Sequence, residues 1–567
     1  MNRALILLAS ASAAYATSLS SACTAARVRD SLPEDGYILG VTFDHDSVTA
    51  NAVYNSSHSD EVFFPDATIN YCNVTFSYTH EGSDDSVIVG YYMPAPSNFK
   101  NRFLATGGGA YAIQSGSMSA PGGVMYGAAS GFTDGGFGSM DTDFDDIFLL
   151  HNGTINWPSV YMFGYQAIRE MTIIGKQFTK NFYDVSNNTK VYSYYQGCSE
   201  GGREGFSQAQ RAGEEYDGLM IGAPAIRYED PGLLPPPCEL EKIVNETIAA
   251  CDPLDGRKDG VVSRSDLCQL QFNMTSIIGK SYYCASSSSS SLGLGFGKRD
   301  STEPAQNGTV SAEGVAVAQK IVDGLHDSKG RRAYISYQMG ASFDDAATSY
   351  DSTTGEWGLD IAGAGGEWIA RFLELHDEDN LSSLEGYTYD TLVGYMKQGM
   401  TRYMDSLQTT IPDLTEFYEN GGKIIHFHGE QDESIPTGSS IHYYNSVRQT
   451  MYPGKSYNAS TAALKEWYKL FLVPGAAHCD TNTAQPNGPF PQTNFEVISR
   501  WVEKGIEPVT LNATILQGEY EGNNEQLCAW PLRPYWKNGG KNFTCEYDQA
   551  SIDTFNYNFD AYKLPLY

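Results

Sequence analysis

The chain has 567 residues, too many for one simple core, so we expect several domains or one domain with a large insertion. Its net charge of −31 at pH 7 argues against nucleic acid or an anionic membrane as a partner. The charge fits the solubility of an extracellular protein at least as well as a role towards a substrate. Hydrophobic residues make up 41% of the chain, which fits a globular protein.

Residues 1–16 have the pattern of a cleavable signal peptide. Arg3 precedes an apolar run at residues 4–9, and small residues follow at 14–16. No later segment of the sequence is long and apolar enough to cross a bilayer. We therefore expect cleavage within about residues 16–18 and a secreted, extracellular protein.

The cysteines agree with secretion. Ten cysteines, an even number, favour five disulfides in an oxidising compartment. Cys23 and Cys72 lie close enough in sequence to pair. Sequons for N-glycosylation, among them Asn73-Val74-Thr75 and Asn542-Phe543-Thr544, suggest a heavily glycosylated protein.

A glycine-rich loop follows the second of two strand-like segments near the start of the chain. The first segment covers residues 87–93, and the second ends in Gly107-Gly108-Gly109. Glycines after a strand let backbone amides approach a ligand closely, so the N–H groups of Gly108 and Gly109 are candidate donors to an oxyanion. The alternative is an ordinary flexible turn.

Strands and helices alternate up to residue 225. Apolar residues recur at helical spacing over residues 157–182, which predicts one long amphipathic helix. Residues 218–225 are typical of a buried parallel strand. The alternation predicts a doubly wound, mainly parallel α/β sheet, with the first part of the core at residues 17–225.

Residues 191–205 combine a strand, a sharp turn and a helix. A β-branched and aromatic run leads into the sequence Gly-Cys-Ser-Glu-Gly at residues 197–201. A serine at the tip of such a turn is strained and exposed, as a nucleophile must be, which makes Ser199 the candidate. The N–H of Glu200, at the positive end of the helix, can then receive the oxyanion. The bare pattern is weak evidence in a chain with 57 glycines.

The alternation then weakens. A proline-rich run at residues 235–238 opens a segment of weaker periodicity, and strand-type residues return only at 423–428. We interpret residues 226–420 as an inserted lid domain and residues 421–567 as the second part of the core. In an enzyme with an α/β core, an inserted lid domain forms a wall of the substrate pocket.

An aspartate-rich loop, residues 251–262, lies in the insertion. Asp252, Asp255 and Asp259 are separated by tight turns and can converge as hard oxygen ligands, with backbone carbonyls completing the shell. We expect Ca²⁺ here, although the spacing is not that of an EF-hand; magnesium and zinc fit less well. The alternative is a turn closed by a Cys251–Cys268 disulfide.

A low-complexity linker occupies residues 285–305. Its serine- and glycine-rich composition predicts disorder. The dibasic pair Lys298-Arg299 would suit a processing protease of the secretory pathway. The alternative is an uncut surface loop.

A base and an acid for Ser199 follow in the second part of the core. His478 comes just after a strand, where an α/β-hydrolase places its base, and Asp432 lies in a loop after the preceding strand. The order Ser199, Asp432, His478 is the order of the α/β-hydrolase triad. We interpret His426 and His428 as strand residues.

Two glutamates compete with Asp432 for the role of the acid. Glu430 and Glu433 lie in the same loop, but Asp432 leads directly into an Ile-Pro turn that resembles triad-acid loops. We therefore prefer Asp432.

Two cysteines flank the candidate nucleophile and base. Cys198 immediately precedes Ser199, and Cys479 immediately follows His478. If the serine and the histidine touch, the cysteines are neighbours, and their disulfide would join the two halves of the active site. An accidental occurrence of both adjacencies is improbable, so this is the most specific signal in the chain.

Taken together, these motifs resemble the tannase and feruloyl esterase family of secreted fungal and bacterial esterases, and most closely its tannase branch. The matching segments are residues 107–109, 197–203, 216–218, 235–240 and 251–261, with Asp432, His478 and Cys479. The likeness covers essentially the whole mature chain.

The resemblance implies an α/β-hydrolase with a lid that cleaves galloyl ester and depside bonds of gallotannins and releases gallic acid. A feruloyl or chlorogenate esterase of the same family is the alternative. A secreted binding module without catalysis would lack a member of the triad, and none is missing.

The resemblance also implies a structural Ca²⁺ in the lid. Its expected ligands are Asp252, Asp255, Asp259 and the backbone carbonyls of Arg257 and Val261. Cleavage after Arg299 would leave two disulfide-linked chains. We further expect the pairs Cys238–Cys284 and Cys528–Cys545.

Overall fold

The computed structural model describes residues 18–59, 61–186, 188–226, 237–289, 301–344, 348–352, 356–359 and 361–562. The expected signal peptide and the pair Lys298-Arg299 lie outside these residues. No helix in the described part of the chain is long and apolar enough to cross a membrane.

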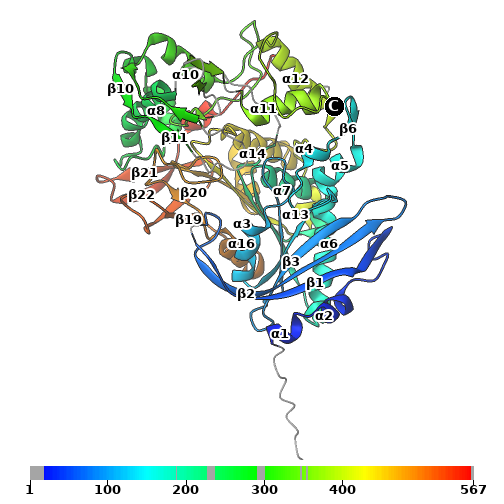
Figure 1. Cartoon of the computed structure of the whole chain (residues 1–567). Coiled ribbons are helices and arrows are strands. Elements are labelled where there is room, and N and C mark those ends of the chain that lie inside the picture. Colours follow the sequence, from blue (N-terminus) through cyan, green and yellow to red (C-terminus); the bar gives the residue numbers. More distant parts are fainter. Residues whose placement is uncertain are drawn as a thin grey trace, which may run out of the picture.

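A nine-stranded sheet forms the centre of the fold, in the order β1-β2-β3-β5-β4-β8-β9-β16-β17 (Figure 1). Its strands are β1 (Val41–His58), β2 (Ala67–His80), β3 (Val87–Pro94), β4 (Arg102–Thr106), β5 (Ala128–Thr133), β8 (Tyr192–Cys198), β9 (Gly218–Gly222), β16 (Lys423–Gly429) and β17 (Tyr468–Val473). The strands from β5 to β17 are parallel, whereas β1, β2 and β3 pair antiparallel. The predicted mainly parallel α/β sheet is confirmed, with an antiparallel extension at its N-terminal edge.

Both faces of the parallel strands are buried. Successive side chains of a strand point to opposite faces of the sheet and pack in two separate apolar clusters. In β9, Leu219 and Ile221 pack in the cluster that also contains Phe206, whereas Met220 packs in the cluster with Trp501. The first cluster includes residues of α6 (Ala167–Phe182), α7 (Glu200–Arg211) and α14 (Gly438–Met451), and the second includes α16 (Asn494–Lys504). Helices therefore cover the sheet on both sides.

The predicted helix over residues 157–182 is present but irregular. It consists of α5 (Trp157–Tyr161), a π-helical turn (Met162–Gln166) and α6. Widening the turn changes the pairing of its carbonyl groups, and two of these carbonyls accept hydrogen bonds from the buried guanidinium of Arg203 at 2.9 Å each. The predicted long helix is therefore present over residues 157–182, and contacts with α7 stabilise a π turn within it.

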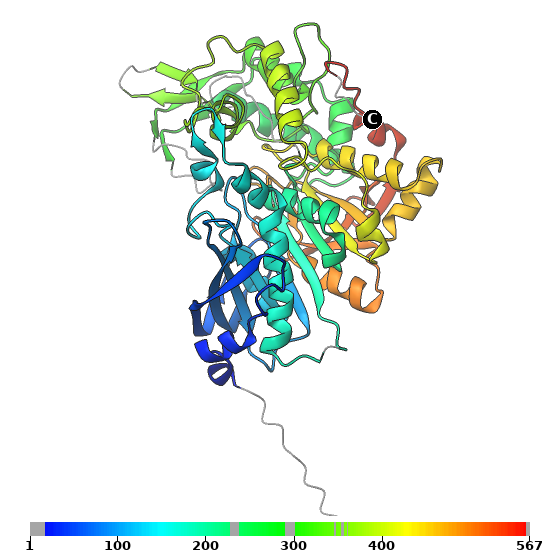
Figure 2. The ribbon, with the colours of Figure 1, turned by 90° about the vertical axis from the view of Figure 1, so that its right-hand side faces the viewer.

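The segment between β9 and β16 adds no strand to the main sheet within the described residues. Its helices are α8 (Pro237–Cys251), α9 (Ser265–Gln271), α10 (Ala312–Asp323), α11 (Gly363–Glu367), α12 (Tyr389–Arg402) and α13 (Thr415–Glu419). Its strands pair two by two: β10 (Ser281–Cys284) with β13 (Gln306–Thr309), β11 (Ser287–Ser289) with β12 (Ser301–Glu303), and β14 (Thr348–Asp351) with β15 (Glu356–Leu359). Figures 1 and 2 show this green part at the opposite end of the molecule from β1 and β2.

The chain after β17 forms small sheets of its own. Its strands are β18 (Pro489–Phe490), β19 (Thr510–Ile515), β20 (Asn524–Cys528), β21 (Leu532–Lys537) and β22 (Asn542–Tyr547), followed by α17 (Gln549–Thr554). The first three make one sheet and the last two make a hairpin. The second part of the expected core thus supplies only β16 and β17 to the main sheet among the described strands.

Ten cysteines form five disulfides: Cys23–Cys72, Cys198–Cys479, Cys238–Cys284, Cys251–Cys268 and Cys528–Cys545. These are the pairs expected from the sequence. Two of them, Cys238–Cys284 and Cys251–Cys268, lie within the segment between β9 and β16, where Cys251 and Cys268 also pack in an apolar cluster with residues of α8 and α10.

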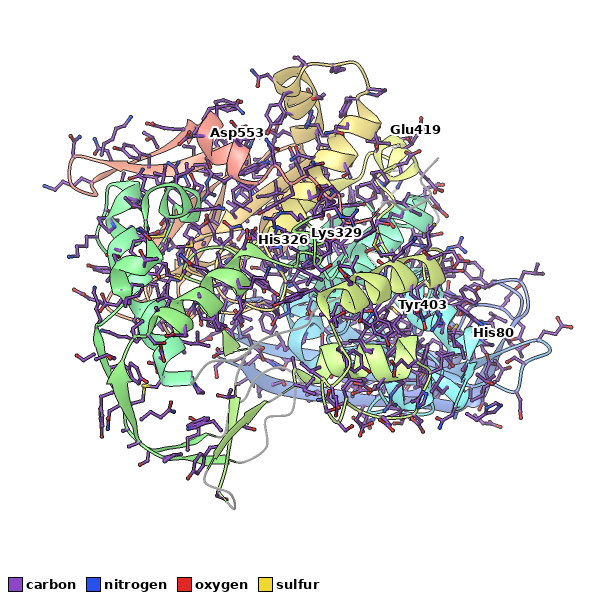
Figure 3. The ribbon with its side chains drawn as sticks, turned by 90° about the horizontal axis from the view of Figure 1, so that it is seen from above. His80, His326, Lys329, Tyr403, Glu419 and Asp553 are labelled. Carbon is purple, nitrogen blue, oxygen red and sulfur yellow. A yellow bond between two sulfur atoms is a disulfide. The ribbon has the colours of Figure 1, made fainter. Side chains whose placement is uncertain are left out.

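An ionic contact links the antiparallel strands to α6. His80, at the end of β2, has its Nδ1 at 2.6 Å from an oxygen of Asp85 and its Nε2 at 3.1 Å from Glu170 on α6. The hydrogen bond with Glu170, together with that of Asp85, raises the pKa of His80 to about 9 despite partial burial. Figure 3 shows His80 near the edge of the molecule.

The raised pKa of His80 predicts a pH-dependent contribution to stability. The pKa of an unperturbed histidine is 6.5. The stabilisation by charged His80 is therefore fully present below pH 6.5 and is lost as the pH rises through about 9. We expect His80→Gln to lower the melting temperature by roughly 2 °C at pH 6 and by much less at pH 9.5. Thermal unfolding at both pH values tests this, and an equal loss at both would contradict it.

Candidate active site

Ser199 occupies a strained turn between β8 and α7. Its φ is 62° and its ψ is −119°, a conformation that costs a residue with a side chain about 1–3 kcal/mol. The neighbouring glycines are required by close packing, since a Cβ on Gly197 would lie 2.5 Å from the carbonyl oxygen of Gly201. The turn thus has the geometry of a nucleophile elbow.

The three residues predicted for the triad lie within hydrogen-bond distance of one another. His478 Nε2 is 2.9 Å from Ser199 Oγ, and His478 Nδ1 is 2.9 Å from Asp432 Oδ2. Asp432 is buried, whereas Ser199 and His478 are partly exposed. Because Asp432 accepts a hydrogen bond from Nδ1–H, the neutral ring presents Nε2 as a base to the serine hydroxyl.

Burial alone would raise the pKa of Asp432, but the adjacent His478 and hydrogen bonds from two imidazole rings lower it well below its usual value. The other carboxylate oxygen accepts hydrogen bonds from the backbone N–H groups of Ser434 at 2.9 Å and Ile435 at 2.7 Å. The acid is therefore ionised and fixed in orientation at any pH near neutrality.

The two competing glutamates have other contacts. The carboxylate of Glu430 pairs with Arg533 and accepts a hydrogen bond from Ser265 Oγ at 2.6 Å. Glu433 accepts a hydrogen bond from the backbone N–H of His478 at 3.3 Å. Asp432 is thus the carboxylate that contacts the ring of His478.

A buried ionic network holds the loop that carries Asp432. Arg533 on β21 pairs with Glu430 and, at 2.9 Å, with Asp266 on α9. Asp266 also pairs with Arg264 at 2.7 Å, and Arg264 with Asp548 at 2.6 Å. Although burial opposes its ionisation, the neighbouring Arg533 lowers the pKa of Asp266 to about 2. Sequence reasoning missed this network, because its members are far apart in the chain and no local pattern marks them.

Removing the central cation of this network should destabilise the protein. Arg533→Met leaves the buried carboxylates of Glu430 and Asp266 without their shared partner, at a cost of roughly 3–5 kcal/mol. Arg500→Met is the matched control, because Arg500 forms a half-exposed pair with Glu496 at 3.8 Å. Urea unfolding of both variants measures the difference, and equal midpoints would contradict this account.

The Cys198–Cys479 disulfide spans the site. Its Cα atoms are 6.1 Å apart, and it joins the residue before the serine to the residue after the histidine across 281 positions of sequence. The two cysteines pack with Ala223 in a small apolar cluster. The disulfide therefore limits how far Ser199 and His478 can separate.

The N–H groups of the glycine loop after β4 have hydrogen-bond partners within the protein. The N–H of Gly108 donates to the carboxyl of Glu204 at 3.0 Å, and the N–H of Gly109 donates to the carbonyl of Ala112 at 3.1 Å. To donate to an oxyanion, either N–H would have to exchange this partner for the ligand. The reason for Gly108 is packing, since a Cβ there would lie 1.8 Å from the Ala112 oxygen. Glu200 starts α7, as expected, with its N–H at the positive end of the helix.

A buried ion pair between Arg203 and Glu200 stabilises the first turn of α7. The Nε of Arg203 donates to the carboxylate of Glu200 at 2.6 Å, and both side chains are almost fully buried. The same guanidinium donates to the π turn before α6. The helix that presents the expected oxyanion donor is thereby fixed against the core.

The aspartate loop has the donor chemistry of a calcium site. One oxygen each of Asp252, Asp255 and Asp259 accepts a backbone N–H of the loop, at 2.9, 2.8 and 3.1 Å. The other oxygen of Asp255 is buried and has no hydrogen-bond partner. Burial raises the pKa of Asp255 to about 6 and that of Asp259 to about 7. A hard cation would neutralise these charges.

The loop does not gather its carboxylates around one point. Within the described residues, no group of three or more His, Cys, Asp or Glu side chains is arranged to hold a metal. The second oxygen of Asp259 lies 2.8 Å from Nε of Arg257 instead. The residues fit Ca²⁺ by chemistry and burial, and binding would require Asp259 to exchange this contact for the ion.

Comparison with known proteins gives consistent matches. The family model "Tannase and feruloyl esterase" matches residues 72–551. The chain is 51% identical to the tannase of Aspergillus oryzae, covering 98% of each chain, and 31% identical to a probable feruloyl esterase of Arthroderma benhamiae, covering 86% and 88%. It is also similar to the solved tannin acyl hydrolase of Aspergillus niger, with 55% identity, a TM-score of 0.92, and 97% and 100% of the chains covered.

Proposed function

Because the chain belongs to the tannase and feruloyl esterase family and is therefore a carboxylic ester hydrolase, we propose that it is a secreted tannase. Its substrates are galloyl esters and depsides of gallotannins, and its product is gallic acid. The higher identity to tannases than to a feruloyl esterase supports this branch. The hydrogen-bonded line from Ser199 through His478 to Asp432 is the observation that carries the reaction type.

The geometry supports an acyl-enzyme mechanism. His478 Nε2 takes the proton of the Ser199 hydroxyl as the oxygen attacks the ester carbonyl carbon, and the N–H of Glu200 donates to the resulting oxyanion. The ester bond then breaks, and His478 returns its proton to the leaving alcohol. Water attacks the galloyl-enzyme by the same route and frees the acid. Asp432 stabilises the charged imidazolium in both steps.

Replacing the nucleophile should abolish turnover and leave the fold intact. Ser199→Ala removes the attacking oxygen, so we expect kcat to fall by roughly 10⁵-fold while the melting temperature changes little. Hydrolysis of methyl gallate by the purified variant measures the loss. Near-normal activity would refute the assignment of Ser199.

A feruloyl or chlorogenate esterase is the second candidate, because the matching family model includes feruloyl esterases. The ratio of kcat/KM for methyl gallate to that for methyl ferulate separates the two, with Ser199→Ala as the blank. We expect a large preference for gallate. A preference for ferulate would leave the triad in place and reassign the substrate.

We also propose that Ca²⁺ is bound by Asp252, Asp255, Asp259 and the backbone carbonyls of Arg257 and Val261. When bound, the ion would neutralise buried carboxylates of the loop and stabilise the insertion. The unpartnered oxygen of Asp255 and the raised pKa values support the site. We also propose that the insertion (residues 226–420) acts as a lid over the substrate pocket. We propose further that the chain is cleaved after Arg299.

Bound Ca²⁺ should raise the free energy of unfolding of the protein. A concentration about 100 times the dissociation constant should stabilise the protein by about 2.7 kcal/mol, so a chelator should lower the melting temperature. Asp255→Asn is the control, because its melting temperature should no longer respond to added Ca²⁺. Lost activity with unchanged melting after chelation would contradict a structural role.

A further inference from the structure

A second histidine contacts the acid of the triad. His428, near the end of β16, has its Nε2 at 3.1 Å from Asp432 Oδ2, the same oxygen that contacts His478. The same nitrogen lies 2.9 Å from the backbone carbonyl oxygen of Ile435. The side chain of His428 is fully buried, and the mechanism above does not use it.

A line of buried polar groups continues from His428 into the core. Its Nδ1 lies 2.6 Å from Ser440 Oγ on α14, and that oxygen lies 2.8 Å from Nε2 of His426. The Nδ1 of His426 lies 2.8 Å from the hydroxyl of Tyr468 on β17. All four side chains are fully buried, and buried polar groups are hydrogen-bonded in folded proteins, so we expect each contact in the line to be a hydrogen bond.

The partners fix which atom donates at each step when both rings are neutral. A carbonyl and an ionised carboxylate only accept, so Nε2 of His428 carries the proton and its Nδ1 accepts from Ser440. Ser440 has one hydroxyl proton, so its oxygen accepts from Nε2–H of His426. The Nδ1 of His426 then accepts from Tyr468. Every donor in the line points towards Asp432.

The surroundings of His426 and Tyr468 favour the neutral form of each. Burial, together with the nearby His428, lowers the pKa of His426 well below its usual value, and burial raises the pKa of Tyr468 well above its usual value. Facing His428 are Asp432 and the Ile435 carbonyl from the loop, His426 from its own strand, and Ser440 from α14. The ring of Phe206 on α7 packs edge-on against His426. Among the described residues, the full charge in direct contact with His428 is the carboxylate of Asp432, to which Nε2–H donates.

We propose that His428 is a positioning residue of the triad, held as an Nε2–H donor by Ser440, His426 and Tyr468, and that it orients the carboxylate of Asp432 towards His478. The inference rests on the triad proposed above. Two donors on one oxygen, with Ser434 and Ile435 on the other, leave the carboxylate a single orientation. Donation from His428 also draws negative charge from the oxygen that stabilises protonated His478, which makes the imidazolium release its proton more readily.

Two substitutions of His428 test the proposal. His428→Leu removes the donor, and His428→Gln retains an amide N–H near the position of Nε2. For the Leu variant we expect kcat on methyl gallate to fall about tenfold, with KM changed less than about twofold. We expect the acid limb of its kcat/KM profile to move up by about half a pH unit, because His478 then holds its proton more tightly. The Gln variant should recover most of the rate and the original limb.

A milder pair of variants covers the case in which His428→Leu does not fold. Ser440→Ala removes the hydroxyl that fixes the tautomer of His428. Ser439→Ala removes the neighbouring hydroxyl, which is buried and makes no hydrogen bond. We expect kcat to fall about threefold in the first variant and to stay at the wild-type value in the second, with the acid limb moved only in the first.

The outcomes separate this inference from the proposed function. If Ser440→Ala and Ser439→Ala behave alike, and any folded His428→Leu keeps the wild-type kcat and acid limb, the positioning role is overturned while the triad stands. If Ser199→Ala retains turnover, the proposed function fails, and the variants of His428 report on something other than a triad.

Discussion

The buried carboxylate of Asp432 is the charge on which the site depends. It is 1% exposed and accepts hydrogen bonds from two backbone N–H groups and two imidazole rings. A buried charge is tolerated only when it is paired and hydrogen-bonded. The groups that hydrogen-bond this carboxylate come from β16, the following loop and the loop after β17. The same hydrogen bonds therefore position Asp432 beside His478 and stabilise this part of the core.

The parallel strands bring these groups together. Ser199, Asp432 and His478 follow the carboxyl ends of β8, β16 and β17, which lie at one edge of the sheet. Two long-range connections then fix the loops. The Cys198–Cys479 disulfide joins the turn at Ser199 to the loop at His478, and the Arg533–Glu430–Asp266 network joins the loop of Asp432 to the insertion and to the chain after β17.

Local patterns sufficed for much of this arrangement. Strand, turn and helix around Ser199, and the order of the loops bearing Asp432 and His478, are visible in the sequence because the parallel core alternates regularly. The pairing of Cys198 with Cys479 followed from their adjacency to catalytic candidates.

Three features could not be predicted in this way. The π turn before α6 depends on Arg203, the N–H of Gly108 donates to Glu204 on α7, and the strand residue His428 contacts Asp432. Each depends on a contact between segments that sequence spacing does not encode.

Covalent labelling of the nucleophile tests the central claim most directly. An organophosphate ester inhibitor reacts with a serine activated by a neighbouring imidazole, and digestion followed by mass spectrometry locates the adduct. We expect one adduct, on Ser199, formed at a rate that falls sharply in His478→Ala. An adduct on another residue, or labelling of Ser199 that is unchanged in His478→Ala, would contradict it.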